Sequence, residues 1–88
     1  MKKIAVIGAI LEQPQVSQKR FNEIVSNFKG MIKGRMGIPF DNQDIAVISL
    51  VVEAELDDIN NLTGKLGRIE HTTVKTTISG NINDKVVN

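Results

Sequence analysis

Two stretches dominate the hydrophobic pattern of the chain, residues 2–11 and residues 44–53. In each of them both alternating sets of positions are apolar; in the first stretch, for example, Ile4 and Ile7 belong to opposite sets. A strand with two apolar faces is typical of the interior of a sheet, where both faces are covered. The pattern therefore predicts two central strands.

Each of these stretches is followed by helical periodicity, over residues 14–29 and residues 55–66. Apolar side chains at helical spacing form one stripe on each predicted helix. The stripes are Phe21, Ile24, Val25 and Phe28 on the first helix, and Leu56, Ile59, Leu62 and Leu66 on the second. Pro14 near the first helical position, and Gly30 and Gly67 just past the last, are typical of helix ends.

Two shorter and more polar segments complete the pattern, residues 31–36 and residues 72–79. Both are predicted to be strands, and alternation places Lys33 and Arg35 on the same face of the first of them. The sequence GRMGIPF at residues 34–40 has two glycines and a proline, which favour a turn. We therefore expect these residues to form the hairpin that leads into the third strand.

The resulting order, β-α-β-β-α-β, predicts an α+β ferredoxin-like sandwich. Its antiparallel sheet has the strand order 4-1-3-2, and both helices cover one face. This order places the two longest and most apolar strands in the centre and the more polar strands at the edges, as expected. Residues 1–79 are expected to be a single domain, followed by a tail at 80–88 that is either an edge extension or disordered.

The second face of this sheet carries the strongest prediction beyond the fold. Two helices cover only one face, yet both central strands are apolar on both faces. A monomer would expose more contiguous apolar surface than such proteins tolerate. We therefore expect a homodimer or tetramer formed through the open sheet face.

The topology also predicts that the segments at 12–14, 34–40 and 64–71 lie at one end of the sheet. Cationic side chains and turn glycines would then meet there and could receive a small anionic or amino-acid ligand. The candidate ligand-binding residues are Arg35, Met36, Gly37, Lys65, Gly67 and Arg68. The alternative is that these charges are solvated and that the glycines serve the turns alone.

Composition narrows the classes of protein to consider. With 88 residues, 41% hydrophobic and 24% charged, the chain is of ordinary globular composition. The net charge of +1 gives no bulk attraction to a polyanion. Cysteine is absent, which excludes disulfides and thiolate chemistry and fits a cytoplasmic location. No apolar run approaches the roughly 20 residues of a membrane span, so no membrane is expected as a partner.

Catalytic and metal-binding chemistry is not expected from these residues. His71 is the single histidine, and stable metal sites need several donors. Neither a Ser-His-Asp nor a Cys-His set can be assembled in one chain. Several carboxylates follow the third strand, where they are typical of the start of a helix; they are Glu53, Glu55, Asp57 and Asp58. We therefore predict a non-enzyme without metal or cofactor.

Direct nucleic-acid binding is also not expected. Ferredoxin-like RNA readers stack bases on aromatic residues of the sheet. This chain has neither tryptophan nor tyrosine, and its three phenylalanines fall on the first predicted helix and in the predicted hairpin.

Several segments together resemble one family, the regulators of the iron-only hydrogenase system. They are IAVIGAIL at 4–11, GRMGIP at 34–39, ISLVVEA at 48–54, LTGKLGR at 62–68 and VKT at 74–76. The resemblance spans nearly the whole chain up to Ser79. It implies an ACT-like variant of the ferredoxin-like fold, similar to the C-terminal domain of the nickel-responsive repressor. It also implies a small cytoplasmic oligomer that regulates hydrogenase expression or maturation.

One departure from that comparison limits what can be carried over. The nickel-responsive repressor domain binds metal through histidines and a cysteine, and this chain lacks that set. Nickel sensing is therefore not expected. A DNA-binding segment before the first strand is not expected either, so direct repression would require a partner protein.

Overall fold

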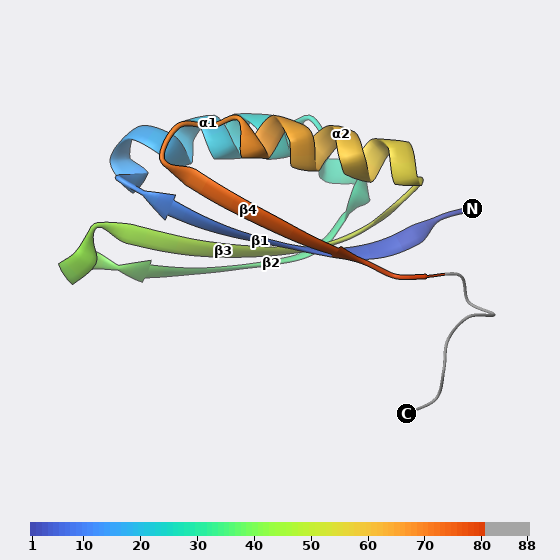
Figure 1. The fold of residues 1–88 in the computed structure, drawn as a ribbon, viewed down its shortest axis with the longest axis horizontal. Coiled ribbons are helices and arrows are strands. Elements are labelled where there is room, and N and C mark those ends of the chain that lie inside the picture. Colours follow the sequence, from blue (N-terminus) through green and yellow to red (C-terminus); the bar gives the residue numbers. More distant parts are fainter. Residues whose placement is uncertain (81–88) are drawn as a thin grey trace, which may run out of the picture.

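A computed structural model of the chain, described for residues 1–80, shows two helices lying on one face of a four-stranded antiparallel sheet (Figure 1). The strands are β1 (Lys3–Glu12), β2 (Ile32–Phe40), β3 (Ile45–Ala54) and β4 (Thr72–Ile78). The helices are α1 (Pro14–Ser26) and α2 (Leu56–Gly67). Short 3₁₀ turns at Lys29–Met31 and Asp41–Gln43 lead into β2 and β3.

The strand order is β2-β3-β1-β4, which is the predicted order 4-1-3-2 read from the other edge. The α+β class, the antiparallel sheet and the central position of the two most apolar strands are thereby confirmed. The tail beyond residue 80, for which an edge extension or disorder was expected, lies outside the described residues.

The core lies between the sheet and the helices. Alternate side chains of the central strands are buried beneath the helices, among them Ile7 and Leu11 of β1 and Ile48 and Leu50 of β3. Burial of apolar surface stabilises the fold by about 25 cal/mol per Å², so this layer is the main source of stability. Val74 and Ile78 of the edge strand β4 pack against it.

The helical stripes are mostly as predicted. Phe21, Ile24 and Val25 of α1 are buried, as are Ile59, Leu62 and Leu66 of α2. Leu56 is an exception: the first residue of α2 is 41% exposed, so its assignment to the buried stripe is wrong. Leu56 is the first residue of α2, and the buried stripe begins three residues later at Ile59.

A buried hydroxyl joins α1 to the end of β1. Ser17 is almost fully buried, and its Oγ donates to the carbonyl oxygens of Glu12 and Gln13 at 3.3 and 3.4 Å. Because an unpaired buried hydroxyl is costly, this bonding accounts for a polar residue in the core. It also fixes the first turn of α1 against the sheet.

Candidate functional site

The predicted hairpin at residues 34–40 is wrong, because these residues belong to the strand β2. The actual turn is Asp41–Gln43 with Asp44, which has a left-handed backbone. Strand β2 lies at the edge of the sheet, where a proline with no N–H to donate is tolerated. Strand β2 therefore continues through Pro39 and the two glycines, although these residue types are typical of a turn.

A β-bulge in β2 separates two cations that simple alternation placed together. Ile32 pairs with Val52 and Gly34 with Val51, which leaves Lys33 as the extra residue. Lys33 pairs with Glu53, its Nζ lying 3.7 Å from Oε1. Arg35 instead lies opposite Leu50, on the helix side of the sheet.

The side chain of Arg35 is engaged with α1. Its Nη2 donates to Oδ1 of Asn22 at 2.7 Å, and its Cζ lies 5.8 Å from the centroid of the Phe21 ring. The guanidinium therefore joins an edge strand to a helix by a hydrogen bond and a cation–π contact. Met36 lies opposite Ser49 on the other face, and Gly37 lies opposite Ile48.

The other half of the predicted site lies at the far edge of the sheet. Lys65 is in the last turn of α2, Gly67 is its last residue and Arg68 is its C-cap. The chain then continues to β4, which is separated from β2 by both central strands. The expectation that Arg35 and Lys65 meet at one site is therefore not met.

One predicted group of neighbours is present in altered form. The Glu12 N–H donates to the His71 carbonyl at 2.7 Å, and the Gln13 N–H donates to the Asp44 carbonyl at 3.1 Å. The segments at 12–14 and 64–71 therefore do meet at this end of the sheet. Their third neighbour is the Asp41–Asp44 turn, not the glycine-rich segment.

This end of the sheet also holds three non-glycine residues with positive φ. They are Gln13 at 53°, Asp44 at 55° and His71 at 63°. A left-handed backbone costs an ordinary residue about 1–2 kcal/mol, and somewhat less for aspartate. The two inter-loop hydrogen bonds help to hold these conformations.

Lys65 and Arg68 share a depression with a residue that the sequence did not single out, Arg20 of α1. The depression lies between α1 and the end of α2. It is lined by Val16, Arg20, Lys65, Arg68, Ile69 and Glu70. Val16 and Arg20 are four residues apart and so lie on one face of α1. That spacing is visible in the sequence, but the partner face on α2 is known only once the helices are placed.

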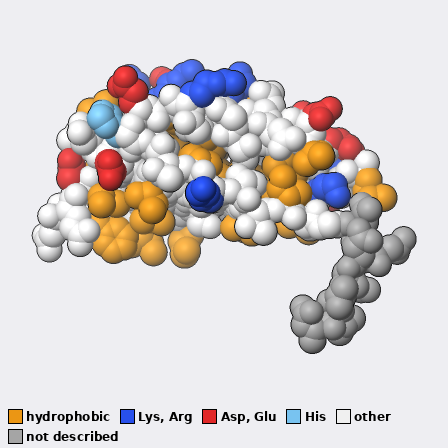
Figure 2. Space-filling model, in the orientation of Figure 1, with side chains coloured by type: hydrophobic (Ala, Val, Ile, Leu, Met, Phe, Trp, Pro, Cys, Tyr) orange, Lys and Arg blue, Asp and Glu red, His pale blue; other side chains and the backbone are white. Residues whose placement is uncertain are grey.

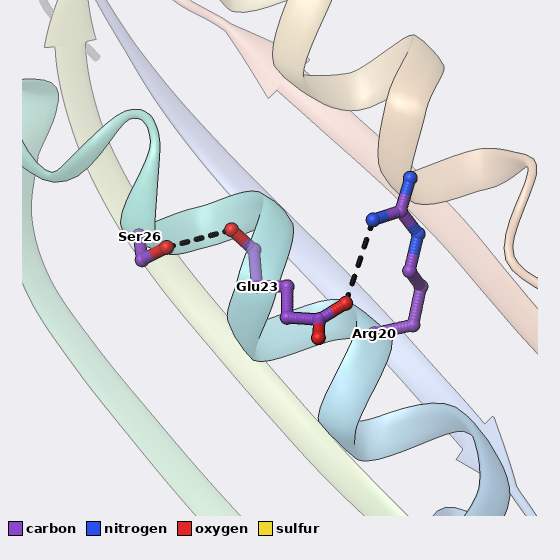
Figure 3. Close-up of polar contacts among 3 residues, drawn as sticks. All are labelled: Arg20, Glu23 and Ser26. Atoms are coloured by element: carbon purple, nitrogen blue, oxygen red, sulfur yellow. Dashed lines mark hydrogen bonds and ion pairs between the residues drawn. The ribbon is translucent and has the colours of Figure 1, made fainter.

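Figure 3 shows how Arg20 is held. Its side chain extends from α1 toward α2, and Nη1 lies 3.5 Å from Oε1 of Glu23 one turn along. Ser26 Oγ donates to the Glu23 carbonyl at 2.7 Å. The Arg20–Glu23 contact is long and both side chains are more than half exposed, so it restrains Arg20 only weakly.

A second depression, of about 310 Å³, lies between the start of α1 and the turn that follows β2. It contains the carboxylates of Asp41 and Asp44 and has no cationic side chain in its lining. It therefore has no cationic side chain to bind an anion and has two carboxylates that would repel one.

The open face of the sheet is apolar, as the sequence predicts. Its larger exposed side chains come from three adjacent strands: Ile4, Val6 and Ile10 of β1, Met36, Ile38 and Phe40 of β2, and Val51 of β3. We call this set the open apolar face. Figure 2 shows hydrophobic side chains gathered beneath the strands, and Lys and Arg side chains over the helices at the top.

Phe40 corrects one expectation about aromatic residues. It is the last residue of β2 and lies opposite Ile45, so the sheet does carry one aromatic side chain. The expectation of none followed from the misplaced hairpin. A single ring at the end of an edge strand is not the set of stacking platforms that RNA readers use.

Within residues 1–80, no group of three or more His, Cys, Asp or Glu side chains is placed to hold a metal ion. His71 is therefore not part of such a group there. In the same part of the chain, neither helix is long and apolar enough to cross a membrane.

The topology and the two faces define a ferredoxin-like α+β module with a helical layer and an open apolar sheet face. Residues 3–76 match the model of the TM1266-like family. This family is provisionally described as a regulator of the iron-only hydrogenase system. The chain therefore belongs to this family, as its sequence motifs indicate.

A solved structure supports this assignment. The uncharacterized protein TM1266 from Thermotoga maritima matches with a TM-score of 0.85 and 32% sequence identity. The match covers 89% of this chain and 98% of that one. No curated protein matches this chain.

Proposed function

We propose that this protein is a non-catalytic regulatory module of the iron-only hydrogenase system, which works as a homo-oligomer in the cytoplasm and responds to a small anionic ligand. Family membership supports the regulatory role. The protein carries out no catalytic step in this role and acts through assembly and ligand binding.

The observation that carries the oligomer is the open apolar face. Strands spaced about 4.8 Å apart and rising about 3.3 Å per residue give roughly 600 Å² for the whole face of the sheet, which consists of the open apolar face on β1, β2 and β3 and the outer side of β4. Two such faces in contact would bury roughly 1,200 Å², which reaches the lower limit of stable interfaces.

A second copy of the chain is the occupant that we propose for this face. The same apolar surface is then presented by both partners, as a two-fold interface requires. Near the middle of the face, Gly8 pairs with Ser49. Because both residues are small, side chains of a facing sheet have room to pack between Val6 and Ile10.

Light scattering on the purified chain tests this proposal. The wild type should have two or four times the mass of the 9.7 kDa chain. Val51→Glu places a carboxylate in the open face and should yield the monomer, because an unpaired buried charge is strongly unfavourable. Leu56→Glu is the matched control, since Leu56 is 41% exposed and Val51 is 40% exposed, but Leu56 lies on a helix.

A monomeric wild type would overturn the homo-oligomer and would favour a module that binds a different protein through this face. The regulatory role is tested separately in cells that use the iron-only hydrogenase. Loss of the chain should change hydrogenase activity or transcript level, and Val51→Glu should reproduce that change. An unchanged level in both strains would contradict the role.

A further inference from the structure

The depression between α1 and α2 gathers more positive charge than its surroundings neutralise. Three cationic side chains line it, Arg20, Lys65 and Arg68, against one carboxylate, Glu70. Within the lining the difference, three minus one, leaves two positive charges, and Glu23 outside the lining offsets Arg20 only in part. The chain as a whole is nearly neutral at +1, so this concentration is local.

Two of these cations have no partner in the described part of the chain. For Lys65 and Arg68, residues 1–80 provide neither an ion pair nor a side-chain hydrogen bond. Arg20 has only the weak contact with Glu23 on its own helix. All three side chains can therefore turn toward a ligand without breaking a strong interaction.

The neighbouring helix ends affect the potential in opposite directions. The first turn of α1 has no acidic residue and no side-chain cap, so this helix end adds positive potential where Val16 lines the depression. The C-terminal end of α2 is negative, and Lys65 in its last turn offsets this. The charged side chains therefore decide the sign of the site, and it is positive.

The depression also has an apolar part. Ile69 is 9% exposed and belongs to the core, whereas Val16 is 56% exposed on α1. Together they offer a small aliphatic surface beside the cations. The volume, about 390 Å³, is in the range of sites for small organic molecules.

We propose that this depression, formed by Arg20, Lys65, Arg68, Val16 and Ile69, binds a small organic dianion. Its oxyanion groups bind the cations, and its short aliphatic body lies on the two apolar side chains. Dicarboxylates and phosphate monoesters share this chemistry. The site is on the helical layer, so it stays accessible when the open apolar face is covered. The inference rests on the proposed regulatory role and supplies the ligand class for it.

Isothermal titration at low ionic strength tests the site with four probes: succinate, glycerol 3-phosphate, inorganic phosphate and acetate. The organic dianions should bind, and the monoanion acetate should bind at least about tenfold more weakly, because it engages fewer cations. The preferred dianion distinguishes a carboxylate ligand from a phosphate ligand. If inorganic phosphate binds as tightly as both organic dianions, the aliphatic contact is wrong.

Two variants and a matched control locate the binding. Arg68→Gln and Arg20→Gln should each weaken binding of the preferred dianion about tenfold, the effect of losing one charge-assisted hydrogen bond. Lys19→Gln removes an exposed cation of α1 that is absent from the depression, and it should leave the affinity unchanged. Equal effects of all three variants would show screening of general surface charge and would overturn the site.

Light scattering on the same samples separates this inference from the proposed oligomer. An oligomer that binds neither organic dianion at millimolar concentration overturns the site alone. A monomer that binds a dianion with the expected variant pattern keeps the site and overturns the oligomer.

Discussion

Gly64 lies inside α2 without a packing reason for a glycine. A Cβ at this position would meet only Arg68 Nη2, at 4.0 Å, which is ordinary contact. Glycine in a helix interior costs about 1 kcal/mol relative to alanine. Gly64→Ala should therefore raise the free energy of unfolding by about 0.5–1 kcal/mol, measured by chemical denaturation at fixed protein concentration.

Gly67 supplies the control for that substitution. It is the last residue of α2, and no atom lies within 4 Å of the position its Cβ would take. Gly67→Ala should have a smaller effect, because a helix end has fewer intrahelical bonds to protect. If Gly64→Ala destabilises instead, something outside the described chain, such as a second copy, packs on this glycine.

Gln13 is the residue where the backbone and the side-chain type conflict most clearly. It is the N-cap of α1 with a left-handed backbone, and it makes no side-chain capping bond. Glycine adopts this conformation without a steric cost and is accepted at N-caps. Gln13→Gly should stabilise the protein by up to about 1 kcal/mol, which corresponds to a rise in Tm of a few degrees.

Asp44 is the comparison residue for this prediction. Its φ is 55°, close to that of Gln13, but aspartate tolerates the left-handed region better than glutamine does. Asp44→Gly should therefore increase Tm less than Gln13→Gly. The reverse order would show that the Gln13 side chain contributes an interaction that offsets its backbone cost.

At the level of elements, the contact between β2 and α1 depends on Arg35. Its hydrogen bond to Asn22 and its position over the Phe21 ring are together expected to contribute about 1–2 kcal/mol. Arg35→Ala should lower the free energy of unfolding by that amount. Arg35→Lys should lose less, because an ammonium retains the charge but not the planar geometry.

The same substitution checks whether Arg35 belongs to a ligand site. Arg35→Ala should leave the affinity for succinate and glycerol 3-phosphate unchanged, because Arg35 is not in the lining of the depression. A large loss of affinity with little loss of stability would restore Arg35 to the site that the sequence predicted.

Strand β2 shows where prediction from sequence ends. Gly34, Gly37 and Pro39 are turn residues by type, and it is the edge position that makes Pro39 compatible with a strand. The bulge at Lys33 then shifts every later side chain to the other face, which turns Arg35 toward α1. Hydrophobic periodicity does not reveal one extra residue in a strand, so the hairpin was misplaced and Arg35 was expected beside Lys65.

For the whole molecule, the sequence was sufficient for the topology because two independent patterns agree. The order of strands and helices restricts the chain to a few arrangements, and the apolar central strands select one of them. The depression with Arg20 depends instead on which faces of two antiparallel helices meet. That is a tertiary property, and the sequence indicates only the face of each helix separately.

The open apolar face predicts how stability depends on concentration. If association contributes to folding, unfolding of a dimer releases two chains, and a hundredfold higher protein concentration stabilises it by about 2.7 kcal/mol. For a dimer of this size the wild-type Tm should rise by roughly 5–10 °C over that range. The Tm of Val51→Glu should be independent of concentration and lower, whereas Leu56→Glu should follow the wild type. A wild-type Tm that does not change with concentration would mean that each sheet is stable with its apolar face uncovered. The area of that face would then be available to a different protein.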